Sequence, residues 1–117
     1  GADAIVVPAR PAGGEQPWGH DAAALADAVT PATRLVFVAN PNNPTGTYLH
    51  GDELRALLEA IPRDVIVVVD EAYAEYVTAP DYPDTLPWLA AFPNLVITRT
   101  FSKIHGLAGL RIGYGVG

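Results

Sequence analysis

The chain has no cysteine and few basic residues. Without cysteine it can hold neither a disulfide framework nor a thiolate metal site. Its three histidines, His20, His50 and His105, are scattered rather than placed at metal-ligand spacing. Lys and Arg number 7 against 13 Asp and Glu, a net charge of -6, and no basic cluster is available to neutralise a phosphate backbone. We therefore expect no metal site and no nucleic-acid partner.

Long hydrophobic runs are also missing, because the longest strongly apolar run is only as long as a strand. No charged and then apolar leader opens the chain, so we expect no membrane span, no signal peptide and a cytoplasmic setting. Hydrophobic residues still make up 50% of the 117 residues, which suffices for a core. The chain opens and stops next to strand-like runs and contains no methionine. We expect it to be an internal segment of a longer protein.

Apolar runs bounded by turn residues predict strands at residues 4–7, 35–39, 65–69 and 95–98, with a weaker candidate at 111–116. The run VIVVV at 65–69 does not alternate, which is typical of a strand covered on both faces in a parallel sheet.

Helical patterns lie between these runs, at residues 21–29, 51–61 and 85–91, the last with Asp84 as its expected cap. The clearest is GDELRALLEAI, in which Leu54, Leu57, Leu58 and Ile61 recur at helical spacing. Strands alternating with helices predict an α/β fold, a mostly parallel sheet with helices on both faces. Ligand sites in such folds lie at the C-terminal ends of the strands.

Three polar motifs follow three of the predicted strands directly. NPNNPTG at 40–46 follows LVFVA, DEAYAEY at 70–76 follows VIVVV, and TFSK at 100–103 follows LVITR. Because the carboxyl ends of parallel strands meet at one edge of a sheet, we expect the three motifs to converge there.

The first two motifs offer partners for an aromatic ring. Asp70 closes an aliphatic run and needs a cation or a donor, and a protonated pyridine nitrogen is one such partner, although a turn cap is an alternative. Tyr73 could present its hydroxyl to the same ring, although a lone tyrosine often only packs. Asn43 lies in a stiff turn that could hold its amide as a donor, and a purely structural turn is the alternative.

The third motif centres on Lys103, whose amine can form a Schiff base with an aldehyde. Thr100 and Ser102 supply hydroxyls, and Arg111 supplies a planar fork suited to a phosphate. A lysine in a loop is otherwise usually just solvated. Together with Asn43, Asp70 and Tyr73, these groups predict a site for pyridoxal 5'-phosphate.

The motifs NPNNPTG, DEAYAEY and RTFSKIHGLAGLRIGYG resemble the signature of the fold-type-I aminotransferases that depend on pyridoxal phosphate, and within that superfamily they most resemble the histidinol-phosphate aminotransferases. The resemblance implies that Lys103 bonds to the cofactor aldehyde and that Asp70 pairs with the pyridine nitrogen. It implies that Asn43 and Tyr73 contact the phenolic oxygen. It also implies phosphate contacts from Thr100, Ser102 and Arg111.

The same resemblance implies that residues 1–117 are the central portion of the large cofactor-binding domain, without its N-terminal part and the C-terminal small domain, and that the last strand is antiparallel. The implied reaction converts L-histidinol phosphate and 2-oxoglutarate to imidazole acetol phosphate and L-glutamate in histidine biosynthesis. The implied enzyme is a homodimer, and the isolated segment is expected to be inactive. Alternatives are an aromatic amino acid aminotransferase, an enzyme like threonine-phosphate decarboxylase, or an inactive folded fragment or binding module.

Overall fold

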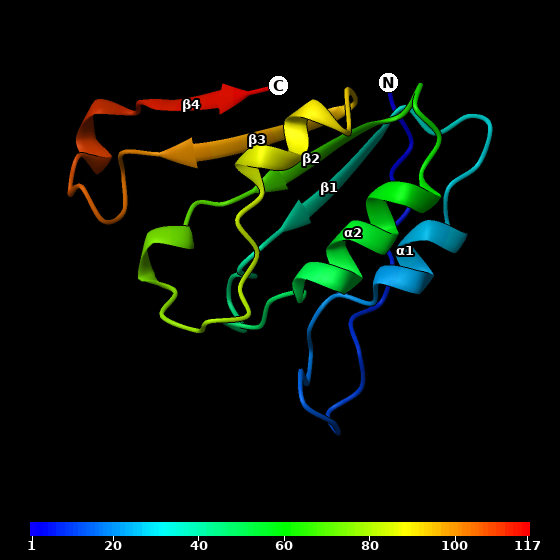
Figure 1. Cartoon of the computed structure of the whole chain (residues 1–117), viewed down its shortest axis with the longest axis horizontal. Coiled ribbons are helices and arrows are strands. Elements are labelled where there is room, and N and C mark those ends of the chain that lie inside the picture. Colours follow the sequence, from blue (N-terminus) through cyan, green and yellow to red (C-terminus); the bar gives the residue numbers. More distant parts are fainter.

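The computed structural model describes all residues from 1 to 117 and contains one four-stranded sheet in the order β1-β2-β3-β4. The strands are β1 (Leu35–Ala39), β2 (Ile66–Asp70), β3 (Leu95–Thr100) and β4 (Gly113–Val116). The first three pair in parallel, and β4 returns antiparallel to β3. In Figure 1 the arrowheads of β1, β2 and β3 all point to the left, and that of β4 points to the right. The expected mostly parallel sheet and its antiparallel last strand are confirmed.

Two α-helices and three short 3-10 helices connect these strands. The α-helices are α1 (Ala22–Asp27) and α2 (Gly51–Ala60), and the 3-10 helices are η1 (Ala74–Tyr76), η2 (Leu86–Ala90) and η3 (Ala108–Leu110). Asp21 caps α1 by accepting the Ala24 N–H at 3.0 Å. Neither α-helix has the length and apolar character needed to cross a bilayer. The short helix expected at 85–91 exists as η2, but Thr85 rather than Asp84 precedes it.

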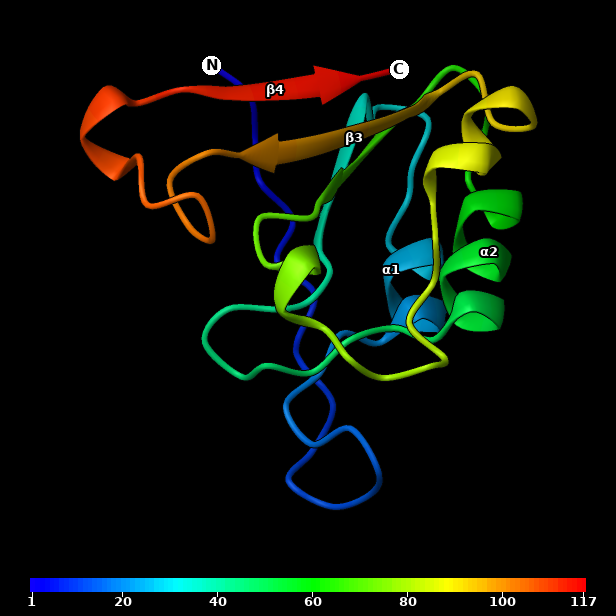
Figure 2. The same cartoon turned by 60° about the vertical axis from the view of Figure 1, so that its left-hand side comes forward.

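The core lies between one face of the sheet and α2. Leu54, Leu57 and Leu58 of α2 are buried against strand side chains that point to the same face: Val36, Val38, Val67, Val69, Leu95 and Ile97. Burying each leucine contributes roughly 1.5–3 kcal/mol. Figures 1 and 2 show α1 beside α2 on the same side of the sheet, where Ala22 joins the same core.

The opposite face of the sheet is open in residues 1–117. Phe37 is 66% exposed and Ile66 47% exposed, and along β2 buried residues alternate with more exposed ones. The prediction that the run at 65–69 is covered on both faces is therefore wrong for these residues. The reason is that both α-helices of this segment pack on a single face, so the apolar side chains of the other face have no cover.

The strand expected at residues 4–7 is absent. This segment is in no sheet, and Val6 is 86% exposed. A run of β-branched residues forms a strand only when another strand pairs with it, because strand propensity reflects its surroundings more than its backbone. Neither edge of the present sheet pairs with residues 4–7.

Candidate functional site

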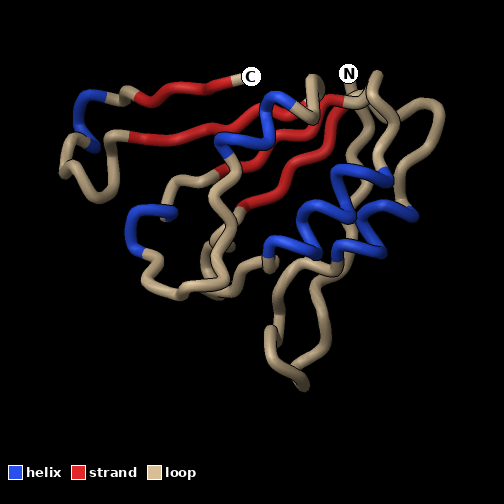
Figure 3. The backbone as a smooth tube through the Cα atoms, in the orientation of Figure 1, coloured by secondary structure: helices blue, strands red, loops and turns tan.

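The three polar motifs leave the same edge of the sheet. Ala39 at the end of β1 is in register with Asp70 at the end of β2, and Asp70 is in register with Thr98 near the end of β3. Figure 3 shows the loops that follow these strands on the side away from the chain termini. The predicted convergence of the motifs is confirmed.

A buried asparagine holds the first loop in place. The Asn40 amide nitrogen donates to the Leu49 carbonyl at 3.3 Å, and its Oδ1 accepts the Leu49 N–H at 2.7 Å, which closes the loop between them. The Tyr82 hydroxyl donates to the Asn40 carbonyl at 2.5 Å. Burial, followed by the negative charge of Glu71, raises the pKa of Tyr82 far above its ordinary value, so this donor keeps its proton.

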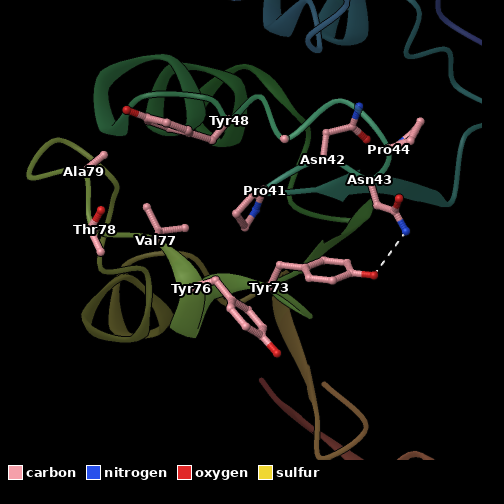
Figure 4. A pocket seen from close by; sticks show the side chains of 11 residues that line it. Pro41, Asn42, Asn43, Pro44, Tyr48, Tyr73, Tyr76, Val77, Thr78 and Ala79 are labelled. Carbon is pink, nitrogen blue, oxygen red and sulfur yellow. Dashed lines mark hydrogen bonds between the residues drawn. The ribbon is translucent and has the colours of Figure 1, made fainter. Parts of the chain in front are cut away.

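Tyr73 joins two of the predicted site residues. The Asn43 amide nitrogen donates to the Tyr73 phenolic oxygen at 3.3 Å, across the gap between the first and second loops (Figure 4). The Lys103 ammonium lies over the same ring, with Nζ 5.1 Å from the ring centroid, which is cation–π distance. Asn43, Tyr73 and Lys103 therefore come together from three separate loops.

A second cluster forms at the end of β3. The Thr100 hydroxyl accepts the Ser102 N–H at 3.0 Å. Arg111 Nη1 lies 3.5 Å from the Ser102 hydroxyl and donates to the Ala108 carbonyl at 2.9 Å. The Arg111 backbone is left-handed, with φ of 53°, which is uncommon for a residue other than glycine and recurs at functional sites. Two hydroxyls and a guanidinium thus share one loop, a set suited to an anion such as a phosphate.

Asp70 is the predicted site residue that the structure joins least to the others. Its Oδ1 accepts the Ala72 N–H at 3.1 Å, and its side chain is exposed on the open face of the sheet. The local bond is the turn cap that was the alternative to a ring partner. The exposed carboxylate can still accept a donor from a bound molecule.

A cavity of about 420 Å³ adjoins the bond between Asn43 and Tyr73. Figure 4 shows it between the first loop and the segment from Tyr73 to Ala79. Tyr48 and Tyr76 also line it, and Lys103 does not. The cavity therefore borders Asn43 and Tyr73 but not Lys103.

Two charged residues next to the predicted site, the buried Glu71 and the partly buried Arg99, were not among its candidates. Glu71 is 1% exposed, and its carboxylate accepts two bonds from Arg99 of β3, at 2.7 and 3.0 Å. Burial lowers the pKa of Arg99, but the hydrogen bonds and charge of Glu71 outweigh it and leave that pKa above its ordinary value. The sequence signal was strand alternation: if Asp70 faces one side of the sheet, Glu71 faces the core and needs a cation.

Comparisons with known proteins show which family the chain resembles. The family model of aminotransferase class I and II matches residues 1–117. Histidinol-phosphate aminotransferase 1 of Nitrosococcus oceani is 65% identical over 99 residues, which are 85% of this chain and 27% of that protein. The chain thus spans little more than a quarter of that relative's length.

Solved structures show the same likeness. The crystal structure of histidinol-phosphate aminotransferase from Sinorhizobium meliloti, in complex with pyridoxal-5'-phosphate, is 37% identical with a TM-score of 0.75, over 85% of this chain and 27% of that one. The L-threonine-O-3-phosphate decarboxylase of Porphyromonas gingivalis is 31% identical with a TM-score of 0.66, over 80% of this chain and 28% of that one.

Proposed function

The chain belongs to the class I and II aminotransferase family, and from that premise we propose that the protein containing it is an aminotransferase that uses pyridoxal phosphate. Its proposed substrates are L-histidinol phosphate as amino donor and 2-oxoglutarate as acceptor. The observation that carries the proposal is the meeting of Asn43, Tyr73 and Lys103 at the edge of the sheet where the predicted anion ligands also lie.

The residues present fit this cofactor by their chemistry. Lys103 offers an amine to the aldehyde, and Asp70 offers an exposed carboxylate to the pyridine nitrogen. The Asn43 amide and the Tyr73 hydroxyl lie 3.3 Å apart, so both can donate to one phenolic oxygen. When bound, pyridoxal phosphate supplies an aldehyde for the substrate amine and a ring that withdraws electrons from the substrate α-carbon.

The chain's own residues would bind the cofactor and move the substrate proton. Asp70 would hold a proton on the ring nitrogen, and Thr100, Ser102 and Arg111 would bind the phosphate and so orient the ring. Lys103 would hold the cofactor through its side-chain amine. The same amine, when free, would act as the general base and acid for the proton at the substrate α-carbon.

The proposal also covers the larger protein. We propose that residues 1–117 form the central portion of its large domain, which agrees with the short share of the relatives' length that they match. The protein would act in the cytoplasm as a homodimer.

A direct test uses the full-length protein with both substrates and follows L-glutamate formation. Lys103 is the only lysine in residues 1–117, so borohydride reduction of the loaded protein should leave the cofactor on the peptide that contains it, as read by mass spectrometry. Lys103→Ala should lose the adduct and essentially all turnover. Normal turnover in Lys103→Ala, or no adduct in the unsubstituted protein, would overturn the proposal.

A second candidate reaction is decarboxylation of L-threonine phosphate, which the similarity to the Porphyromonas gingivalis enzyme favours. It would use the same cofactor residues. A substrate panel separates the two reactions: release of CO₂ from L-threonine phosphate without glutamate formation would replace the first proposal with the second. Turnover of aromatic amino acids alone would point to an aromatic aminotransferase.

A further inference from the structure

Glu71 has a fully satisfied carboxylate in the interior of the protein. One oxygen, Oε2, accepts Arg99 Nε at 3.0 Å and Arg99 Nη2 at 2.7 Å, and the other, Oε1, accepts the Thr85 hydroxyl. A buried carboxylate without such partners would cost several kcal/mol. Three separate segments of the chain therefore meet at the buried carboxylate of Glu71.

The position of this ion pair relates it to the candidate site. Glu71 directly follows Asp70 and is part of the turn that carries Tyr73, whereas Arg99 directly precedes Thr100 and the loop of Lys103. The Glu71 N–H also donates to the Thr98 carbonyl at 2.9 Å, so backbone and side chain both fasten this turn to β3. The pair thus links the residues proposed for the cofactor ring to those proposed for its phosphate.

The other arginine–carboxylate pairs of the chain lie in different surroundings. Arg55 and Glu59 pair on the surface of α2, with more than half of each side chain exposed, and Arg10 and Glu53 are partly exposed. The pair of Glu71 and Arg99 combines a buried carboxylate with a place between two halves of a binding site. Buried pairs add little net stability relative to apolar residues, so stability alone is a poor reason for this one.

We propose that Glu71 is a positioning residue: through Arg99 and Thr85 it sets the distance between the ring-binding turn and the phosphate-binding loop, so that both ends of one cofactor molecule are held at once. This inference rests on the proposed function. The ring-binding turn and the phosphate-binding loop are then two half-sites of one binding site. Because their spacing is rigid, binding of one end of the cofactor favours binding of the other end.

The test measures three affinities on the full-length protein freed of cofactor: for pyridoxal phosphate, for pyridoxal and for inorganic phosphate. In Glu71→Gln, which keeps the size of the side chain but removes its charge, we expect the affinity for pyridoxal phosphate to fall about tenfold. The affinities for pyridoxal and for phosphate should stay within about twofold, because each half-site remains intact. A general loss of stability would lower all three together.

Two further variants keep the test decisive. Thr85→Val preserves the shape of the side chain and removes one donor, and it should lower the affinity for pyridoxal phosphate about threefold without changing the other two. Glu59→Gln breaks the exposed pair with Arg55 and should change none of the affinities. If Glu71→Gln does not fold, the result for Thr85→Val decides.

The outcomes separate the two proposals. Suppose that the unsubstituted protein binds pyridoxal phosphate tightly, but the variants either lose affinity equally for all three ligands or lose none. That result overturns the role of Glu71 and leaves the proposed function standing. Failure of the unsubstituted protein to bind pyridoxal phosphate overturns both.

Discussion

Asn43 and Tyr73 lie 30 positions apart in the sequence, yet the amide of one donates to the phenolic oxygen of the other at 3.3 Å. The two residues belong to different loops, and each loop has its own anchor. The buried Asn40 closes the first, and the ion pair of Glu71 with Arg99 fastens the second. The contact between Asn43 and Tyr73 therefore forms because two loops, each held by its own interactions, lie next to each other.

Removing the Asn43 donor should change the titration of the bound cofactor. If Asn43 donates to the phenolic oxygen of the cofactor as proposed, Asn43→Ala removes one hydrogen bond that stabilises the anionic form of that oxygen, which should then hold its shared proton more strongly. The pH midpoint of the visible absorbance change should rise by about one unit, the equivalent of one hydrogen bond. Asn42→Ala is the matched control, because the Asn42 amide bonds only to the Thr45 hydroxyl and should leave the midpoint unchanged.

Two glycines of β4 should differ sharply in their tolerance of alanine. A Cβ on Gly113 would lie 2.7 Å from the Arg99 carbonyl oxygen, whereas a Cβ on Gly115 would have its nearest neighbour at 3.7 Å. Gly113→Ala should cost about 1–3 kcal/mol and weaken cofactor binding, since Gly113 pairs with Thr100. Gly115→Ala should be close to neutral. Thermal unfolding of the two full-length variants provides the comparison, and equal midpoints would contradict it.

The bond from Tyr82 to the Asn40 carbonyl should make stability depend on alkaline pH. Burial raises the pKa of Tyr82 in the folded protein above its ordinary value of 10.0, so the folded state keeps this proton longer than the unfolded state. The contribution of Tyr82 is therefore fully present below pH 10 and is lost as the pH rises toward the folded-state pKa.

Denaturant unfolding of the unsubstituted protein and of Tyr82→Phe, measured from neutral to alkaline pH, checks the direction of this pH dependence. Tyr82→Phe should be less stable by about 1 kcal/mol at neutral pH. The difference in free energy of unfolding between the two proteins should narrow above pH 10, because only the unsubstituted protein loses the contribution of the Tyr82 hydroxyl. A gap that stays constant or widens there would be inconsistent with a buried, protonated Tyr82.

The core between α2 and the sheet should respond to truncation of Leu54, which is fully buried. Leu54→Ala should destabilise the protein by about 2–5 kcal/mol through lost burial and the cavity left behind. Glu59→Ala, on the exposed side of the same helix, should change the free energy of unfolding by less than about 0.5 kcal/mol. The difference between the two variants in a denaturant titration is the measurement.

The sequence predicted those elements whose signals are local. The strand at 35–39 has the predicted bounds, and α2 follows the leucine spacing before Pro62. The segment at 4–7 was mispredicted because its residue types favour a strand but no partner lies beside it. The roles of the seven predicted site residues stay predictions, although the structure groups six of them in two clusters of three.

The pair of Glu71 and Arg99 could not be predicted in the same way. Strand alternation indicates that Glu71 faces the core and needs a cation, but it does not identify that cation, and the partner lies 28 positions away on another strand. Only the pairing of β2 with β3 brings the two together. Long-range pairs of this kind depend on register, which a sequence pattern leaves open.

The loop between β3 and β4 is closed at its base, where the Phe101 N–H donates to the Ile112 carbonyl at 3.2 Å, and it has internal bonds such as that from Gly106 N–H to the Lys103 carbonyl at 2.9 Å. Lys103 and Arg111 both lie inside this one closed loop. An insertion or deletion between them would therefore change the separation of the proposed covalent anchor from the proposed anion ligand.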